Sequence, residues 1–302
     1  MPQIFAVVVT YEADEALLSA LLQALSPQVA GGIVINNGDS LPLSDTYLRQ
    51  VGFAVKHLQS NTGVATALNT GFQWAEAQGA EFVITFDQDS EPASDMVPHL
   101  LGAYRSLLAS GQKVGAVGPL QIDRRTGQPA TFIAPISWRR HRVIPAAGQT
   151  LEVDHLITSG CLVPVTAWKC AGAFLDALFI DYVDIEWSLR LRHRGWHLFG
   201  VADATLVHAI GDDIQQWRGR QIAWHSPLRH YFMFRNGIYL QKLPHIPLGW
   251  KLFDAFQLLK KLLFFTLVGR SRSAHLRAMF YGIRDGWRGR LGPASSEPDC
   301  QP

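Results

Sequence analysis

The sequence predicts an α/β fold, with a mostly parallel, Rossmann-like sheet flanked by helices and a basic C-terminal extension of amphipathic helices. Two observations carry this prediction. Short β-branched and aromatic runs alternate with segments whose leucines recur at helical spacing. Residues 215–292 contain 14 lysines and arginines but only two acidic residues, although the whole chain has a net charge of only +2. This asymmetry indicates a C-terminal surface that meets an anionic partner.

The composition is that of a globular protein in a reducing compartment. Of the 302 residues, 48% are hydrophobic and 17% are charged, a low charged fraction that indicates extensive burial. The three cysteines have neither metal-type nor disulfide-framework spacing. We expect no signal peptide, because a strand pattern begins at once, and no spanning helix, because polar residues interrupt the longest apolar run, 252–269.

The first part of the chain alternates strands and helices. Strands are predicted over 4–12, 33–35, 53–58 and 82–86, and helices over 13–25 and 64–77, the second capped near Asn61 or Thr62. This order favours parallel pairing through right-handed crossovers. No G-x-G-x-x-G fingerprint follows the first strand, which disfavours a dinucleotide site.

The stretch 82–91 is the centre of this pattern. An apolar strand runs directly into Asp87 and Asp89, which places both carboxylates at the carboxyl edge of the sheet, where α/β proteins bind ligands. Mg²⁺ commonly takes one or two carboxylates together with substrate phosphates, so this pair suggests a metal–diphosphate ligand. An Asp-rich turn that caps the next helix is the alternative.

Polar residues end all four of these strands. They are Thr10, Tyr11 and Glu12; Asn37 and Asp39; Asn61 and Gly63; and Asp87 and Asp89. The carboxyl ends of parallel strands meet at one edge, so these residues would line a common crevice. Each fits ordinary turn chemistry by itself, but together they favour a nucleotide site.

A second acidic cluster lies in residues 178–190. On a helix that begins here, Asp184 and Glu186 point to different sides, so one can face the cleft while the other pairs with Arg190. An apolar flank would give the cleft carboxylate a pKa suited to deprotonating a hydroxyl. Acids that simply complement the helix dipole are the alternative. His208, at the end of a strand predicted over 200–208, could contact a metal or phosphate, or be structural.

In this order the motifs resemble the family 2 glycosyltransferases of the GT-A fold, and within them the bacterial rhamnosyltransferases of surface polysaccharide synthesis. The resemblance covers residues 4 to about 240. It is carried by 9–12, 36–39, 61–65 with Asn69 and Gly71, 86–90, 160–161 and 179–187. Related transferases more often have Glu-Asp-x-Asp at the second acidic site, where this chain has Val183-Asp184.

The resemblance implies transfer of a sugar from a nucleotide diphosphate to an acceptor hydroxyl, with inversion and with Mg²⁺ or Mn²⁺ as cofactor. It implies nucleotide contacts at Thr10, Tyr11, Glu12, Asn37, Asp39, Asn61, Gly63 and Asp87. It implies metal contacts at Asp89, Asp87 and His208. Asp184 would be the general base, supported by Glu186 and Arg190.

The donor implied is dTDP-L-rhamnose and the acceptor a lipid-linked glycan. The expected organisation is a catalytic domain over 1–228, a membrane-associating helical region over 229–292 and a tail over 293–302. Aromatic and basic residues on amphipathic helices suit the anionic cytoplasmic face of a membrane. A helical cap on the sheet or an oligomer contact is the alternative, and nucleic acid is disfavoured because these helices are apolar.

Three other functions compete with this one. A UDP-hexose donor would keep the reaction and change only the nucleotide. A sugar nucleotidyltransferase is disfavoured, because no Gly-rich phosphate loop bearing Arg or Lys follows the first strand. A non-catalytic nucleotide-sugar-binding or scaffold protein would not need Asp87, Asp89 and Asp184 together. A homo-oligomer stays open.

Overall fold

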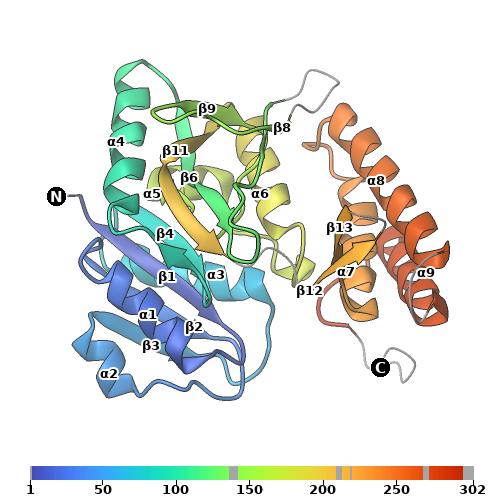
Figure 1. Cartoon of the computed structure of the whole chain (residues 1–302), viewed down its shortest axis with the longest axis horizontal. Helices are drawn as coiled ribbons and strands as arrows, with labels where there is room; N and C mark the ends of the chain where they lie inside the picture. The colour runs from blue at the N-terminus through green and yellow to red at the C-terminus, as the bar shows by residue number, and fades with distance from the viewer. Residues whose placement is uncertain (1, 136–141, 209–212, 218–219, 268–271, 295–302) are drawn as a thin grey trace.

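A computed structural model of the chain describes residues 2–135, 142–208, 213–217, 220–267 and 272–294. Figure 1 shows a central sheet with helices on both faces and a group of C-terminal helices at one side. The predicted α/β class is confirmed, because most paired residues of the central sheet lie in parallel ladders and helices cover both faces.

The central sheet has the strand order β3-β2-β1-β4-β10-β6-β11-β5, with β9 paired to β11. Its strands are β1 (Ile4–Thr10), β2 (Gly31–Asn36), β3 (Phe53–His57), β4 (Phe82–Asp87), β5 (Glu91–Pro92), β6 (Val114–Asp123), β9 (Thr150–Val153), β10 (Leu162–Pro164) and β11 (His197–His208). Strands β1 to β4 pair in parallel, as do β6 and β11. The antiparallel strand β10 joins these two blocks.

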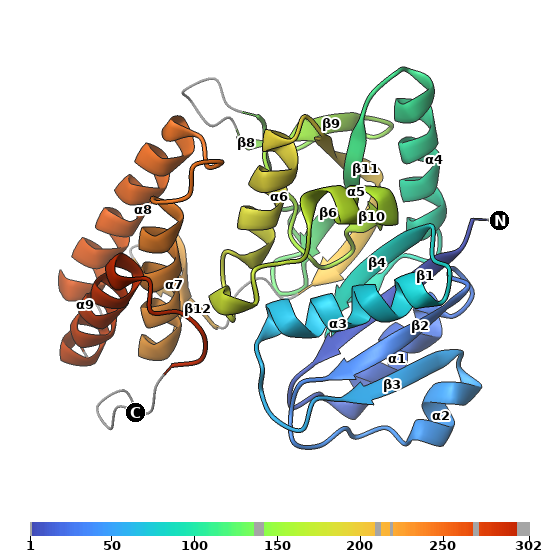
Figure 2. The same cartoon turned by 180° about the vertical axis from the view of Figure 1, so that it is seen from behind.

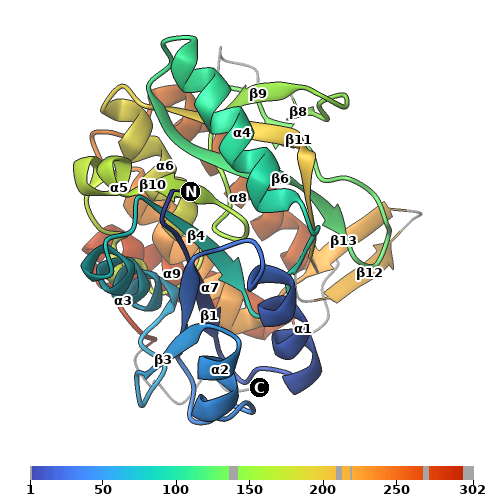
Figure 3. The ribbon, with the colours of Figure 1, turned by 90° about the vertical axis from the view of Figure 1, so that its left-hand side faces the viewer.

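Both faces of the sheet are buried under helices. The helices of this part are α1 (Glu15–Leu25), α2 (Asp45–Gln50), α3 (Val64–Ala77), α4 (Met96–Ala109), α5 (Val165–Ala171) and α6 (Val183–His193). Val7 and Val9 pack in a core beneath α3, α5 and α6, which lie together on one face in Figure 2. Ala6 and Val8 face the other way, towards α1 and α4, which Figure 3 shows across the opposite face. This two-sided burial explains the unbroken apolar run of β1.

The N-terminus of α3 differs from the prediction. Its N-cap is Gly63 rather than Asn61 or Thr62, and no side chain caps it. Gly63 has a φ of 88°, and a Cβ there would lie 2.6 Å from Phe179 Cδ2. Glycine is therefore required by both the backbone conformation and the close approach of the Phe179 loop.

Several short elements were absent from the sequence prediction. They are α2, β5, β9, the pair β7 (Phe132–Ile133) and β8 (Arg142–Val143), and the hairpin β12 (Asp213–Trp217) and β13 (Arg220–Trp224). Strands of two to five residues carry too few side chains for a periodic pattern to stand out.

The C-terminal helices are α7 (Pro227–Leu240), α8 (Leu248–Leu267) and α9 (Arg272–Arg288). They pack around a small core of Phe234, Leu258, Phe265 and Met279. Trp250 of α8 belongs instead to the main core, so this helix also packs against the part of the chain that contains the sheet. Within the described ranges, no helix is both long enough and apolar enough to cross a bilayer.

Candidate functional site

The ends of β4 and β11 bring three sequence-predicted residues together. His208 Nδ1 lies 3.2 Å from Asp89 Oδ1, and His208 Nε2 lies 3.7 Å from Asp87 Oδ2. The backbone carbonyl of Asp89 accepts a hydrogen bond from Arg124, which also pairs with Glu91 at 3.0 Å. The imidazole thus bridges the two carboxylates at the carboxyl edge of the sheet.

The two aspartates differ in electrostatic environment. Burial raises the pKa of Asp87, and the charge of Asp89 adds to that effect while His208 opposes it. Burial acts the same way on Asp89, but its contacts with His208 outweigh burial and lower its pKa. Burial disfavours the His208 cation, yet the two carboxylates outweigh it and raise the pKa of His208. Asp89 and His208 therefore favour their charged forms as a pair, whereas burial disfavours the charge on Asp87.

The donor set suits a divalent cation, although it is not assembled as a coordination shell. Two carboxylates and an imidazole are ligands that Mn²⁺ accepts, and Mg²⁺ accepts the carboxylates. Where side chains are described, no three acidic, His or Cys groups are arranged as a metal cluster. Among the described residues, buried His208 Nδ1 contacts Asp89 as an ion pair and has no partner with hydrogen-bond geometry. The residues fit a metal whose remaining ligands come from a bound diphosphate.

Two cavities of about 630 and 750 Å³ meet at this cluster. The smaller one is lined by Tyr11, Asn37, Asn61, Gly63, Asp89 and His208, among others, and we call it the nucleotide cavity after the residues predicted to bind a nucleotide. The larger one is lined by His155, Asp181, Asp184, Trp250, Asp254 and Lys261, among others, and we call it the acceptor cavity after Asp184, the predicted base. Val64, Asp87, Ile180 and Arg229 line both. The shared residues mark the junction of the two cavities.

The predicted nucleotide residues divide into two groups. Tyr11, Asn37, Asn61, Gly63 and Asp87 line the nucleotide cavity. Thr10, Glu12 and Asp39 are not among the described residues that line either cavity. Thr10 is buried beside Asn36, with its hydroxyl near the Ile35 carbonyl, whereas Glu12 and Asp39 are exposed. Their predicted role in base and ribose binding stays a prediction.

Side-chain amides hold the floor of the nucleotide cavity. Asn37 Oδ1 accepts from the backbone N–H of Thr62 at 2.8 Å, and Asn37 Nδ2 donates to Asn61 Oδ1. Gln88 exchanges two hydrogen bonds with the backbone of Tyr11, which ties the end of β1 to the end of β4. These contacts explain why polar residues follow β1, β2 and β4, independently of any ligand.

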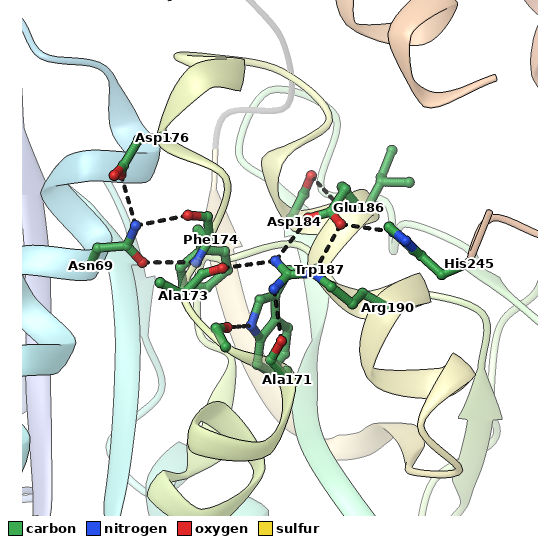
Figure 4. Close-up of polar contacts among 12 residues, drawn as sticks. Asn69, Ala171, Ala173, Phe174, Asp176, Asp184, Glu186, Trp187, Arg190 and His245 are labelled. Atoms are coloured by element: carbon green, nitrogen blue, oxygen red, sulfur yellow. Dashed lines mark hydrogen bonds and ion pairs between the residues drawn. The ribbon is translucent and has the colours of Figure 1, made fainter. Parts of the chain in front are cut away.

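Asp184 and Glu186 lie on different sides of α6, as the sequence predicted (Figure 4). Glu186 is fully buried, binds Arg190 through two contacts of 2.9 Å and lies 2.8 Å from His245 Nε2. Arg190 also donates to the carbonyls of Ala171 and Ala173. Glu186 and Arg190 therefore tie α6 to the segment after α5, and neither is among the described residues lining the cavities.

Asp184 occupies the first turn of α6 and faces the acceptor cavity. Its carboxylate accepts a hydrogen bond from the backbone N–H of Ile185 at 2.8 Å. Burial raises the pKa of Asp184, and nearby His155 opposes that effect. A carboxylate with a raised pKa is a better proton acceptor for a hydroxyl than an ordinary aspartate.

A strained loop precedes Asp184. Phe179, Asp181 and Tyr182 have φ values of 65°, 60° and 65°, which residues with a side chain adopt rarely. Asn236 Nδ2 of α7 holds this loop by donating to the carbonyls of Leu178, Ile180 and Asp181 at 2.7 to 3.0 Å. The α7 helix thus fixes the backbone from which Asp184 projects.

Sequence reasoning missed several residues of the acceptor cavity. Asp181 and Arg229 pair at 3.4 Å, and Tyr182 donates to Asp254 Oδ1 at 2.9 Å. Asp181 stands beside the predicted acids, so its charge was a visible signal. Arg229 and Asp254 lie about 50 to 70 residues from their partners, and no spacing rule connects them.

Comparisons with known proteins agree with these observations. A model of the Glycosyl transferase family 2 matches residues 5–140. A protein of Shigella flexneri described as dTDP-rhamnosyl transferase RfbF is 30% identical over 295 residues, covering 96% of this chain and 97% of that protein.

Solved structures share the fold at low identity. The crystal structure of S. aureus TarS 1-349 in complex with UDP-GlcNAc has a TM-score of 0.58 at 16% identity, covering 94% of this chain and 81% of that chain. GalNAc-T7 with UDP, GalNAc and Mn²⁺ has a TM-score of 0.55 at 16% identity, covering 84% of this chain. The match spans only 54% of the GalNAc-T7 chain. From its nearly full-length relative and its GT-A architecture, we conclude that this chain is an enzyme of the family 2 glycosyltransferases.

Proposed function

We propose that the enzyme transfers L-rhamnose from dTDP-L-rhamnose, with inversion, to a hydroxyl of a lipid-linked glycan in bacterial surface polysaccharide synthesis. The observation that carries this proposal is the meeting of the two cavities at Asp87 and Arg229, with Asp184 on the acceptor side. The dTDP-rhamnosyl transferase relative supports the choice of donor.

Asp184 acts as the general base in this proposal. The acceptor hydroxyl lies in the acceptor cavity and gives its proton to the Asp184 carboxylate as its oxygen attacks the anomeric carbon. The bond from that carbon to the diphosphate breaks, and its electron pair leaves with the nucleoside diphosphate. The raised pKa of Asp184 supports this role, because it makes the carboxylate more basic. Attack from the face opposite the leaving group inverts the anomeric configuration.

Asp89, with Asp87 and His208, would hold a Mg²⁺ or Mn²⁺ ion on the nucleotide side. Such an ion would offset negative charge on the diphosphate. The lowered pKa of Asp89 favours the ionised carboxylate that a metal requires. Glu186 and Arg190 would support the base indirectly, by fixing the helix on which it lies.

Calorimetric titration with dTDP, UDP and GDP, each with Mg²⁺ or Mn²⁺ and again with EDTA, tests the donor. The proposal predicts that dTDP binds most tightly and that EDTA weakens its binding. A preference for UDP would replace the donor with a UDP-hexose and keep the transferase reaction. Failure of all three nucleotides to bind would contradict the proposal.

The outer face of the C-terminal helices supports a membrane-bound acceptor. Large apolar side chains are exposed along α8 and α9: Leu248, Leu252, Phe256, Leu259, Leu263, Leu276, Phe280 and Trp287. The two acids of these helices, Asp254 and Asp285, are buried, whereas Lys260, Arg277 and Arg288 are exposed. We call this face the apolar stripe. An apolar face with only basic exposed charges suits an anionic lipid surface, and we propose that it binds the cytoplasmic leaflet.

Helix α8 would connect that surface with the reaction. Its apolar stripe residues face outward, while Trp250, Asp254 and Lys261 of the same helix line the acceptor cavity. A lipid-linked glycan could therefore keep its lipid in the bilayer while its sugar reaches Asp184.

A further inference from the structure

We propose that Arg229 is a catalytic residue, the cation that stabilises the departing diphosphate; the inference rests on the proposed sugar transfer. Among the four described residues that line both cavities, Val64 and Ile180 are apolar and Asp87 is acidic, so Arg229 is the cation of that set. The bond that breaks during transfer lies where donor and acceptor meet. A cation at that place can stabilise the negative charge that develops on the departing diphosphate.

The position of Arg229 is fixed by the fold. It lies in the first turn of α7, where Ser226 caps the helix by accepting from the backbone N–H of Arg229 at 3.2 Å. Asn236, two turns further on, anchors the same helix to the loop before Asp184. One helix therefore sets both the guanidinium and the backbone that carries the proposed base.

Asp181 is one partner of Arg229. Its Nε and Nη2 both lie 3.4 Å from Asp181 Oδ1, a length at the limit of hydrogen bonding. Arg229 also lines the nucleotide cavity together with Asp87 and Asp89, which places its charge on the nucleotide side. Diphosphate oxygens would offer shorter, charge-assisted contacts than this long pair. Asp181 is then a positioning residue, which holds the guanidinium at the junction.

The breaking bond leaves negative charge on the diphosphate, and a nearby cation stabilises that charge. As the acceptor oxygen bonds to the anomeric carbon, the carbon–oxygen bond to the β-phosphate breaks and its electron pair becomes negative charge on the diphosphate. Arginine stays protonated and presents planar donors that match phosphate oxygens. A donor aimed at developing charge acts chiefly in the transition state and therefore raises kcat.

Binding of dTDP and dTMP in EDTA provides the test. Wild-type protein should bind dTDP more tightly than dTMP, and Arg229→Gln should reduce that preference by roughly tenfold, the loss of one strong contact to a charged group. Arg229→Lys should keep part of the preference. Asp181→Asn should keep or increase it, because the guanidinium loses its competing anion. UDP and UMP form the parallel pair.

Arg142→Gln is the matched control, because Arg142 lines the acceptor cavity and not the nucleotide cavity. It should leave the preference for diphosphate unchanged. In steady-state transfer, Arg229→Gln should lower kcat about 100-fold, as for loss of one preorganised donor, with a small change in acceptor KM.

An equal preference in wild type and Arg229→Gln, with both variants folded by circular dichroism, would overturn the role of Arg229 and leave the proposed function standing. Failure of wild type to bind any of the four nucleotides, with metal or without, would overturn both.

Discussion

The two halves of the site are held in different ways. Asp87, Asp89 and His208 lie at the ends of strands within one sheet, and hydrogen-bonded strand pairing sets their positions. Asp184 follows a strained loop that depends on side chains of α7 and α8. The comparison indicates that strand pairing sets the nucleotide half, whereas the acceptor half requires the C-terminal helices. Changes within one half should therefore spare the other, except where the two halves touch at Gly63 and Phe179.

The largest effect should come from Asp184→Asn. Removing the base should lower kcat by about a thousandfold, within the range for general-base catalysis. Because the folded-state pKa of Asp184 is raised, its charged form costs stability, and that cost grows as pH rises. The amide should therefore raise Tm at neutral pH. In wild type, kcat should fall as pH drops through this raised pKa, which a pH–rate profile would measure.

Replacing the neighbouring carboxylate, Glu186, should lower the stability of the fold, whereas replacing Asp184 should raise it. Glu186→Gln leaves the half-buried Arg190 without its counter-charge and should destabilise the fold by about 3 kcal/mol. The exposed pair of Glu76 and Lys169 gives the control, since Glu76→Gln should cost less than about 1 kcal/mol. Urea unfolding measures both. Equal losses would mean that the Glu186 network does not hold α6.

Gly63→Ala tests the contact between the two halves. The added Cβ would lie within 3 Å of the Phe179 side chain and backbone, so the loop before Asp184 must move. Gly79→Ala has a similar φ of 80° but meets no atom within 4 Å, so it should show only the strain of about 1 kcal/mol. We expect Gly63→Ala to lose more stability and to lower kcat as well. A kcat equal to that of the control would contradict this coupling.

Changes in the apolar stripe should affect membrane binding more than the rate of sugar transfer. Leu252→Glu with Phe256→Glu should weaken binding to anionic vesicles roughly 100-fold, from the loss of two buried apolar side chains. The exposed Leu108 on α4 gives the control, because Leu108→Glu should not change vesicle binding. Cosedimentation measures partitioning, and kcat on a water-soluble acceptor should stay unchanged. Unaltered partitioning would exclude the stripe as the membrane surface.

The same contrast explains what the sequence could predict. Strand ends are local, so Asp87, Asp89 and the polar tips after β1 to β3 could be read from strand patterns alone. The pairing of Glu186 with Arg190 follows from helical spacing. Neither rule could identify Arg229 from the sequence, because its proposed role depends on α7 folding back onto the loop at 178–181.

The strand order in the second half of the sheet also could not be predicted from the sequence. Strand β10 has three residues, and its antiparallel insertion between β4 and β6 leaves no periodic signal. Thr10 shows a different limit, because a polar residue at a strand end can turn inward. Its hydroxyl lies 3.4 Å from the Ile35 carbonyl, a role that its position alone does not reveal.

The most direct test of the divided site is metal-dependent dTDP binding to Asp89→Ala and Asp184→Asn, measured side by side by calorimetry. We predict that Asp89→Ala weakens binding in Mg²⁺ or Mn²⁺ by 10- to about 100-fold, the usual range for a disturbed metal site. Asp184→Asn should bind dTDP as wild type does while losing transfer. Loss of dTDP affinity in Asp184→Asn, or unchanged metal-dependent affinity in Asp89→Ala, would contradict the division of the site into nucleotide and acceptor halves.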